Sequence, residues 1–120
     1  MRLAAALLIV WLIAGAQPAS AGDCLPAGPS PKLDSETLDW TILIPSGQTC
    51  LRGLRSGAML IQSVAISAPA KIGAVTIQGY AFSYSAPRDF KGDDSFSVTV
   101  TGTNRGVRGN STLVVHVSVQ

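Results

Sequence analysis

Beyond its first 21 residues the sequence lacks the apolar periodicity of a helix, and it has few charged or aromatic side chains. Charged residues make up 13% and aromatic residues 6% of the 120 positions. No stretch after residue 21 repeats apolar residues every 3.6 positions, so a long helix is excluded. The eight basic and seven acidic residues after residue 21 leave a net charge of +1. This charge is too small to indicate a nucleic-acid partner.

Residues that carry catalytic chemistry are also scarce. The chain has one histidine and two cysteines, which do not form a zinc-binding spacing. No G-x-S-x-G motif is present, and alternation places His116 on the surface face of its segment. The neighbouring carboxyls of Asp93 and Asp94 diverge, unlike the converging pair of a glycosidase. We therefore expect no enzyme activity, no catalytic residue, no metal and no cofactor.

Calcium is the one metal for which an alternative stays open. Asp89, Asp93 and Asp94 supply oxygen atoms, and calcium takes six to eight such ligands. Arg88 and Lys91 lie among these carboxylates and oppose a cation. The favoured interpretation is a solvated corner in which carboxylates satisfy turn amides.

The first 21 residues have the organisation of a secretory signal peptide. Met1 and Arg2 precede an apolar run of about 14 residues, and Ala19-Ser20-Ala21 forms an A-x-A cleavage site. The run is shorter than the ~20 residues needed to span a bilayer. We expect cleavage after Ala21, no remaining transmembrane segment, and a secreted or periplasmic protein of about 99 residues.

The two cysteines, Cys24 and Cys50, predict one disulfide, because an even count in a small exported domain favours a bridge. Asp23 stands where a lipobox requires a small residue, which disfavours lipidation of Cys24. Closing a loop of this length contributes about 3 kcal/mol in the chain-entropy model.

Residues 22–36 predict an extended, proline-rich lead-in, and residues 37–120 predict one β-domain. Short runs of alternating apolar residues, separated by Gly, Pro and Ser turns, indicate about seven strands. Expected strands cover 38–44, 48–51, 58–67, 72–78, 80–84, 96–101 and 111–119. This pattern is typical of a β-sandwich.

Alternation also predicts which side chains form the core. Tyr80, Phe82 and Tyr84 should share one face, as should Leu60, Val64 and Ile66. The expected core anchors are Trp40, Tyr84, Phe90 and Phe96.

Two segments between strands carry the remaining candidate residues. In the corner that follows Pro87, Gly92 should supply a positive φ and Asp94 should cap turn amides. Residues 104–110 predict a polar link, in which Arg105 and Arg108 could contact an acidic partner.

A motif in the second half resembles the repeats of bacterial cadherin-like, immunoglobulin-like domains of large surface proteins. It runs Tyr84-x-x-Pro87-x-x-Phe90-x-Gly92-x-Asp94-Ser95-Phe96-x-Val98-x-Val100, with Gly73 before it and the run 111–119 after it. The resemblance implies an immunoglobulin-like sandwich without catalysis. Many such repeats carry an Asp where this chain has Gly102, which weakens the calcium alternative.

The leading functional hypothesis is an exported binding or structural module of the cell envelope or extracellular space, with an envelope or extracellular protein as partner. Two alternatives stay open. One is a small secreted hydrolase or hydrolase inhibitor, and the other is an accessory subunit that completes its sheet with a partner strand. The sequence leaves the ligand and the oligomeric state undetermined.

Overall fold

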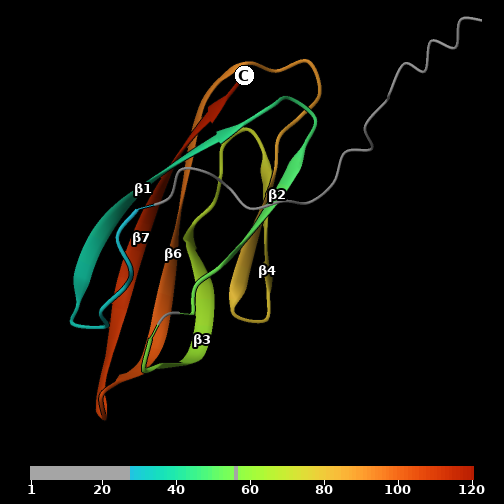
Figure 1. The fold of residues 1–120 in the computed structure, drawn as a ribbon. Helices are drawn as coiled ribbons and strands as arrows, with labels where there is room; N and C mark the ends of the chain where they lie inside the picture. The colour runs from blue at the N-terminus through green and yellow to red at the C-terminus, as the bar shows by residue number, and fades with distance from the viewer. Residues whose placement is uncertain (1–27, 56) are drawn as a thin grey trace, which may run out of the picture.

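The computed structural model describes residues 28–55 and 57–120, and it has seven strands and no helix in these ranges (Figure 1). The strands are β1 (Glu36–Ile44), β2 (Thr49–Gly53), β3 (Met59–Ala68), β4 (Ala74–Gln78), β5 (Ala81–Ser85), β6 (Gly92–Asn104) and β7 (Val107–Val119). The all-β prediction is therefore confirmed. Within the described ranges no helix is long and apolar enough to cross a membrane. The predicted signal peptide and Cys24 lie outside the described residues.

The strands form two sheets. One has the order β1-β7-β6-β3 and the other β2-β5-β4. β1 runs parallel to β7, whereas every other pair is antiparallel. Only β4–β5 and β6–β7 are joined within one sheet, so the chain otherwise crosses between sheets at each connection. Figure 1 shows β6 and β7 as long neighbouring strands, with β1 and β3 outside them.

The core lies between the two sheets and is built from alternate side chains. In β6 and β7 the inward apolar residues are at most 3% exposed: Phe96, Val98, Val100, Leu113, Val115, Val117 and Val119. Phe82 of β5 packs against them, with its ring centroid 5.2 Å from that of Phe96 and 6.3 Å from that of Trp40. Burial of each large apolar side chain stabilises the fold by about 1.5–3 kcal/mol.

The four predicted core anchors differ in burial. Trp40, Tyr84 and Phe96 are 3%, 0% and 2% exposed. The rings of Tyr84 and Phe96 stack with centroids 5.7 Å apart. Phe90 is half-buried and packs at the margin of the core.

β3 does not present the face that its sequence predicts. Met59 and Ile61 are buried, whereas Leu60 is 63% and Ile66 39% exposed. The register against β6 shifts between Ile61 and Ser63. Because such a bulge reverses the alternation that follows it, Leu60 and Ile66 do not share a face.

Tyr80 also departs from the expected pattern. It lies in the turn between β4 and β5 and is 49% exposed, so it does not share the buried face of Phe82 and Tyr84. Alternation continues only as long as the chain stays in the sheet, and the turn at Gly79–Tyr80 ends it.

The expected polar link over residues 104–110 is instead the closed end of a long hairpin. β6 continues to Asn104 and β7 begins at Val107, so Arg105 and Gly106 alone form the turn. Both have positive φ, 53° and 81°, as in the two-residue turns that match the twist of paired strands. Arg108 therefore lies in β7, opposite Thr103, and not in a loop.

The described part of the lead-in packs on the sandwich before β1 begins. Leu33 is 2% exposed, and its amide donates to Oγ of Ser111 at 2.8 Å. The indole N–H of Trp40 donates to the carbonyl of Pro29 at 2.8 Å. Cys50 is buried in β2, but since Cys24 lies outside the described residues, the Cys24–Cys50 disulfide stays a prediction.

Candidate binding site at one end of the sandwich

A hollow of about 580 Å³ opens at the end of the sandwich where the β6–β7 hairpin turns. Its walls come from three separate parts of the chain: the lead-in, the connection before β3, and the hairpin. We call it the loop-end hollow, and its lining residues are Pro29, Ser30, Pro31, Lys32, Asp34, Gly57, Ala58, Met59, Asn104 and Arg105. Its volume falls in the range of small-molecule and peptide side-chain sites.

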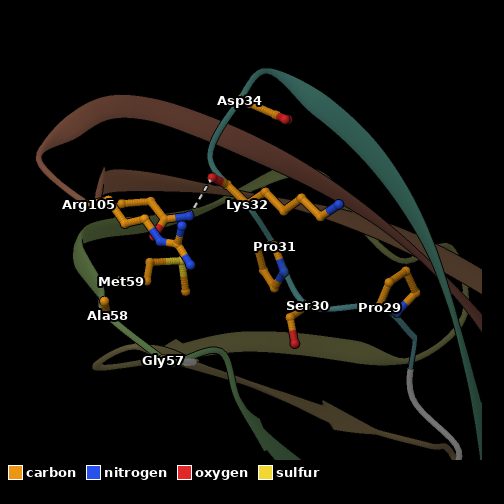
Figure 2. Close-up of a pocket in the computed structure, with 10 residues that line it drawn as sticks. Pro29, Ser30, Pro31, Lys32, Asp34, Gly57, Ala58, Met59 and Arg105 are labelled. Carbon is orange, nitrogen blue, oxygen red and sulfur yellow. Dashed lines mark hydrogen bonds between the residues drawn. The ribbon is translucent and has the colours of Figure 1, made fainter.

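Two cationic side chains line this hollow. Lys32 comes from the lead-in and Arg105 from the hairpin turn. Figure 2 shows Pro29 to Lys32 along one wall, with Arg105 and Met59 on the opposite side. Asp34 is the single acidic residue of the lining, so positive charge predominates.

The backbone around both cations is held in place. The side-chain amide of Asn104 donates to the carbonyl of Lys32 at 3.1 Å, and Figure 2 draws this bond as a dashed line. Arg105 occupies a tight turn between paired strands. The backbones that carry Lys32 and Arg105 are thus joined through Asn104, although 72 residues separate Asn104 from Lys32.

Glu36 holds the lead-in beside this hollow. Its two carboxylate oxygens accept from the amides of Lys32 at 2.6 Å and Asp34 at 3.1 Å, and from the Ser111 hydroxyl at 2.8 Å. Burial alone would raise the pKa of Glu36, but these hydrogen bonds outweigh it and lower the pKa to about 2. We call Glu36 the lead-in carboxylate.

The sequence predicts that Asp94 caps amides of its own corner. In the structure Asp94 instead accepts mainly from amides of the connection between β3 and β4. Because β6 begins at Gly92, Asp94 lies inside the strand on the same face as Phe96, and it is 7% exposed. Its oxygens accept from the amides of Lys71, Gly73 and Ser95 at 3.0, 2.8 and 2.9 Å. We call Asp94 the loop carboxylate.

Tyr84 completes the surroundings of this carboxylate. Its hydroxyl donates to Oδ2 of Asp94 at 2.7 Å. Burial, followed by this bond and the carboxylate's charge, raises the pKa of Tyr84. Burial opposes ionisation of Asp94, but hydrogen bonds from Gly73, Tyr84 and Lys71 lower the pKa of Asp94 below its usual range. The cluster fastens the β3–β4 connection, which joins the two sheets, onto β6.

At two positions of the motif, Gly73 and Gly92, the local geometry explains why glycine is present. A Cβ on Gly73 would lie 2.5 Å from the Tyr84 hydroxyl, so the close approach of this loop to Tyr84 and Asp94 requires glycine. Gly92 has φ of 149° and its Cβ would lie 3.1 Å from the Phe90 ring. The motif residues thus contact one another in space, and their role is structural, because they close one end of the sandwich.

A shallower hollow of about 320 Å³ lies next to Asp94 on the outer face, lined by Lys71, Ile72, Asp93, Asp94, Ser95 and His116. Nε2 of His116 lies 3.1 Å from Oδ1 of Asp39, and the two side chains are 55% and 76% exposed. Ser95 pairs with His116 across the sheet, but no hydrogen bond joins their side chains among the described residues. A hydrolytic triad needs a serine hydroxyl that is hydrogen-bonded to the histidine. Asp39, His116 and Ser95 do not provide this bond.

The three aspartates of the calcium alternative do not converge. Asp94 is engaged by amides and Tyr84, whereas Asp89 and Asp93 are exposed. Within residues 28–55 and 57–120, no three His, Cys, Asp or Glu side chains gather closely enough to hold a metal ion.

The sequence predicts a binding segment around Arg105 but does not predict a role for Lys32, Glu36 or Ser111. The signal for Ser111 was present, since it continues the inward alternation of Leu113 and Val115 as a polar residue. Nothing in the sequence pointed to Lys32 or Glu36, because their contacts depend on where the lead-in crosses the sheet. Arg108 does not line the loop-end hollow.

No family model matches the chain, and no curated protein matches it. Among solved structures, it is similar to a sialyltransferase from Photobacterium damsela, with 13% identity and a TM-score of 0.43. That similarity covers 71% of this chain and 18% of the sialyltransferase. It is also similar to amebosin, with 15% identity, a TM-score of 0.29, and coverage of 72% and 98%. At these scores neither similarity supports an argument about function.

Proposed function

We propose that this protein is an exported, non-enzymatic binding module with an immunoglobulin-like fold, and that it binds an acidic group of an envelope or extracellular protein at the loop-end hollow. The observation that carries the proposal is the placement of Lys32 and Arg105 around one hollow of about 580 Å³. Export and a secreted or periplasmic location depend on the signal-peptide pattern in residues 1–21.

The strand order supports the immunoglobulin-like part. An immunoglobulin constant domain has sheets of order A-B-E-D and C-F-G. Here β2-β5-β4 corresponds to B-E-D, and β3, β6 and β7 correspond to C, F and G. β1 joins the sheet that contains β3, β6 and β7, and it runs parallel to β7. The motif shared with cadherin-like repeats is consistent with this order, because its residues close the sandwich.

The chemistry of the hollow supports an acidic ligand. The planar guanidinium group of arginine can form two parallel hydrogen bonds to one carboxylate or phosphate group, and the lysine ammonium adds a point charge. Pro29 and Ala58 of the lining are exposed and offer apolar contact around these charges, whereas Met59 and Pro31 are buried. End loops of sandwich domains are a common position for binding residues.

The test starts with a partner captured from envelope or extracellular extract on the immobilised protein. Lys32→Ala combined with Arg105→Ala should weaken its binding by about tenfold and reduce its salt dependence, because exposed ion pairs contribute at most about 1 kcal/mol each. Arg108→Ala is the matched control, since it removes an exposed arginine three positions away that does not line the hollow. Thermal unfolding should be the same for all variants.

If the double variant binds as tightly as the parent protein, and with the same salt dependence, the loop-end hollow is not the contact surface. If Arg108→Ala weakens binding as much as the double variant does, the partner contacts the outer face of the hairpin instead.

A further inference from the structure

β3 forms an edge of the four-stranded sheet, and none of its ten residues is charged. One side of β3 pairs with β6, and no described strand pairs with the other side. Such an edge presents unpaired backbone N–H and C=O groups to any strand that can approach it. The opposite edge, β1, carries Glu36 and Asp39, whose charges oppose pairing with another copy of themselves.

The inner face of β3 is only partly buried. Val64 lies opposite Val100 and Ile66 lies opposite Val98 in the ladder with β6. Both valines of β6 are 0% exposed, whereas Ile66 is 39% exposed. The apolar rows that form the core therefore continue onto β3 and end at an uncovered isoleucine.

Beyond β3 the same side of the sandwich mixes apolar and polar residues, with Lys71 as its exposed charge. β4, an edge strand of the other sheet, contacts β3 and also has no charged residue. Ile72, in the connection between β3 and β4, is 44% exposed. The charge-free edge of β3, with the exposed Ile66 at the end of its inner row, indicates a pairing surface.

We propose that β3 pairs antiparallel with β3 of a second copy of this chain, about a two-fold axis through Ala65. This register places Val64 of each copy opposite Ile66 of the other, both on the inner face. Ser63 then faces Ser67. Cross-strand pairs of β-branched side chains stabilise sheets, and a two-fold interface uses the same patch on both copies.

The register follows from the face that each side chain occupies. A shift of one residue would set inner-face side chains opposite outer-face ones. The next matching register, centred on Val64, would set Ile66 opposite Gln62, where the ladder with β6 is irregular. The regular stretch between the two register shifts, Ser63–Ile66, is short, so the dimer should dissociate on dilution.

The test measures the mass of the purified protein in solution over a wide range of concentrations. The expected result is a mass that doubles as concentration rises. Ala65→Lys should abolish the doubling, because the axis brings two ammonium groups together. Thr41→Lys, which adds the same charge to the exposed face of β1, should leave the doubling unchanged. Circular dichroism checks that both variants keep the sheet.

A second measurement tests the register. Ala65→Cys should form a dimer linked through residue 65 on mild oxidation, since directly opposite residues lie within disulfide reach. Thr41→Cys should form markedly less. A parent protein that is monomeric at every concentration would overturn the proposal, as would a dimer that persists in Ala65→Lys or one that cross-links better through residue 41. These results do not depend on Lys32 or Arg105, so they leave the proposed function separately testable.

Discussion

Asp94 and Glu36 each accept hydrogen bonds from the backbone of an irregular segment, at opposite ends of the four-stranded sheet. Asp94 is 7% exposed and holds the β3–β4 connection. Glu36 is half-buried at the start of β1 and holds the lead-in beside the loop-end hollow. Each also accepts from a hydroxyl, that of Tyr84 or of Ser111.

The difference between the two lies in what replaces the carboxylate when it is removed. Around Asp94 the Tyr84 hydroxyl is fully buried and the loop amides are partly buried, so water would replace the lost carboxylate only in part and the hydroxyl would remain unpaired. Around Glu36 the amides of Lys32 and Asp34 lie in an exposed segment, where water can serve as acceptor. The loop carboxylate should therefore matter for the whole fold, and the lead-in carboxylate mainly for the wall of the hollow.

Asp94→Ala should have the largest effect, lowering the free energy of unfolding by about 3 kcal/mol, because the buried Tyr84 hydroxyl and several part-buried amides lose their acceptor together. Urea unfolding measures this. Asp94→Asn should fall between Ala and the parent, since it keeps one oxygen. Asp93→Ala, an exposed neighbour, should change stability by less than about 0.5 kcal/mol. Equal losses for Asp93→Ala and Asp94→Ala would contradict the assignment.

Glu36→Ala should lower the free energy of unfolding by about 1 kcal/mol, the usual net value of partly exposed hydrogen bonds. Its clearer effect should be local, with faster amide hydrogen exchange in residues 32–35 and little change in β6. Thr37→Ala, one residue further along β1 and exposed, is the matched control. Exchange that rises equally throughout both sheets would mean that Glu36 supports the whole fold instead.

The smallest expected effect is the pH dependence that Glu36 adds. Its folded pKa of about 2 lies below the ordinary value of 4.5. A depressed pKa means that the contribution to stability is present above pH ~5 and is lost as pH falls toward 2. Asp94, whose pKa is also lowered, acts in the same direction. Glu36→Gln should flatten the stability profile between pH 5 and 2, and Asp94→Asn should flatten it further, in urea titrations at each pH. Profiles parallel to that of the parent would show that neither carboxylate is coupled to folding.

The parts of the fold that were predictable are those in which local alternation continues into the sheet. Phe96, Val98 and Val100 alternate with Ser and Thr, and all three are buried. Prediction was wrong where a local irregularity changed the pattern. The bulge in β3 places Leu60 on the opposite face from Val64 and Ile66, and the turn at Gly79–Tyr80 removes Tyr80 from the core.

The polar end of the hairpin departs from its predicted structure for a different reason. Residues 104–110 have the composition of a loop, yet most of them belong to β6 and β7, because backbone pairing continues beyond the last buried side chains. Amino-acid composition indicates whether a segment is buried, not whether its backbone is paired. A strand with both faces in water therefore has no apolar alternation by which the sequence could reveal it. A two-residue turn of Arg and Gly is a weak signal compared with Asn-Gly or Asp-Gly.

By itself, the sequence determined the strand-forming segments, most of their inward faces and the motif that contains Asp94, since these depend on neighbours along the chain. Tertiary structure decided which amides Asp94 accepts from, because residues 71 and 73 reach it only when the chain crosses between sheets. It also decided that Lys32 and Arg105 line one hollow. Such contacts join residues distant in sequence, and only the packing of the two sheets and the lead-in brings them within bonding distance.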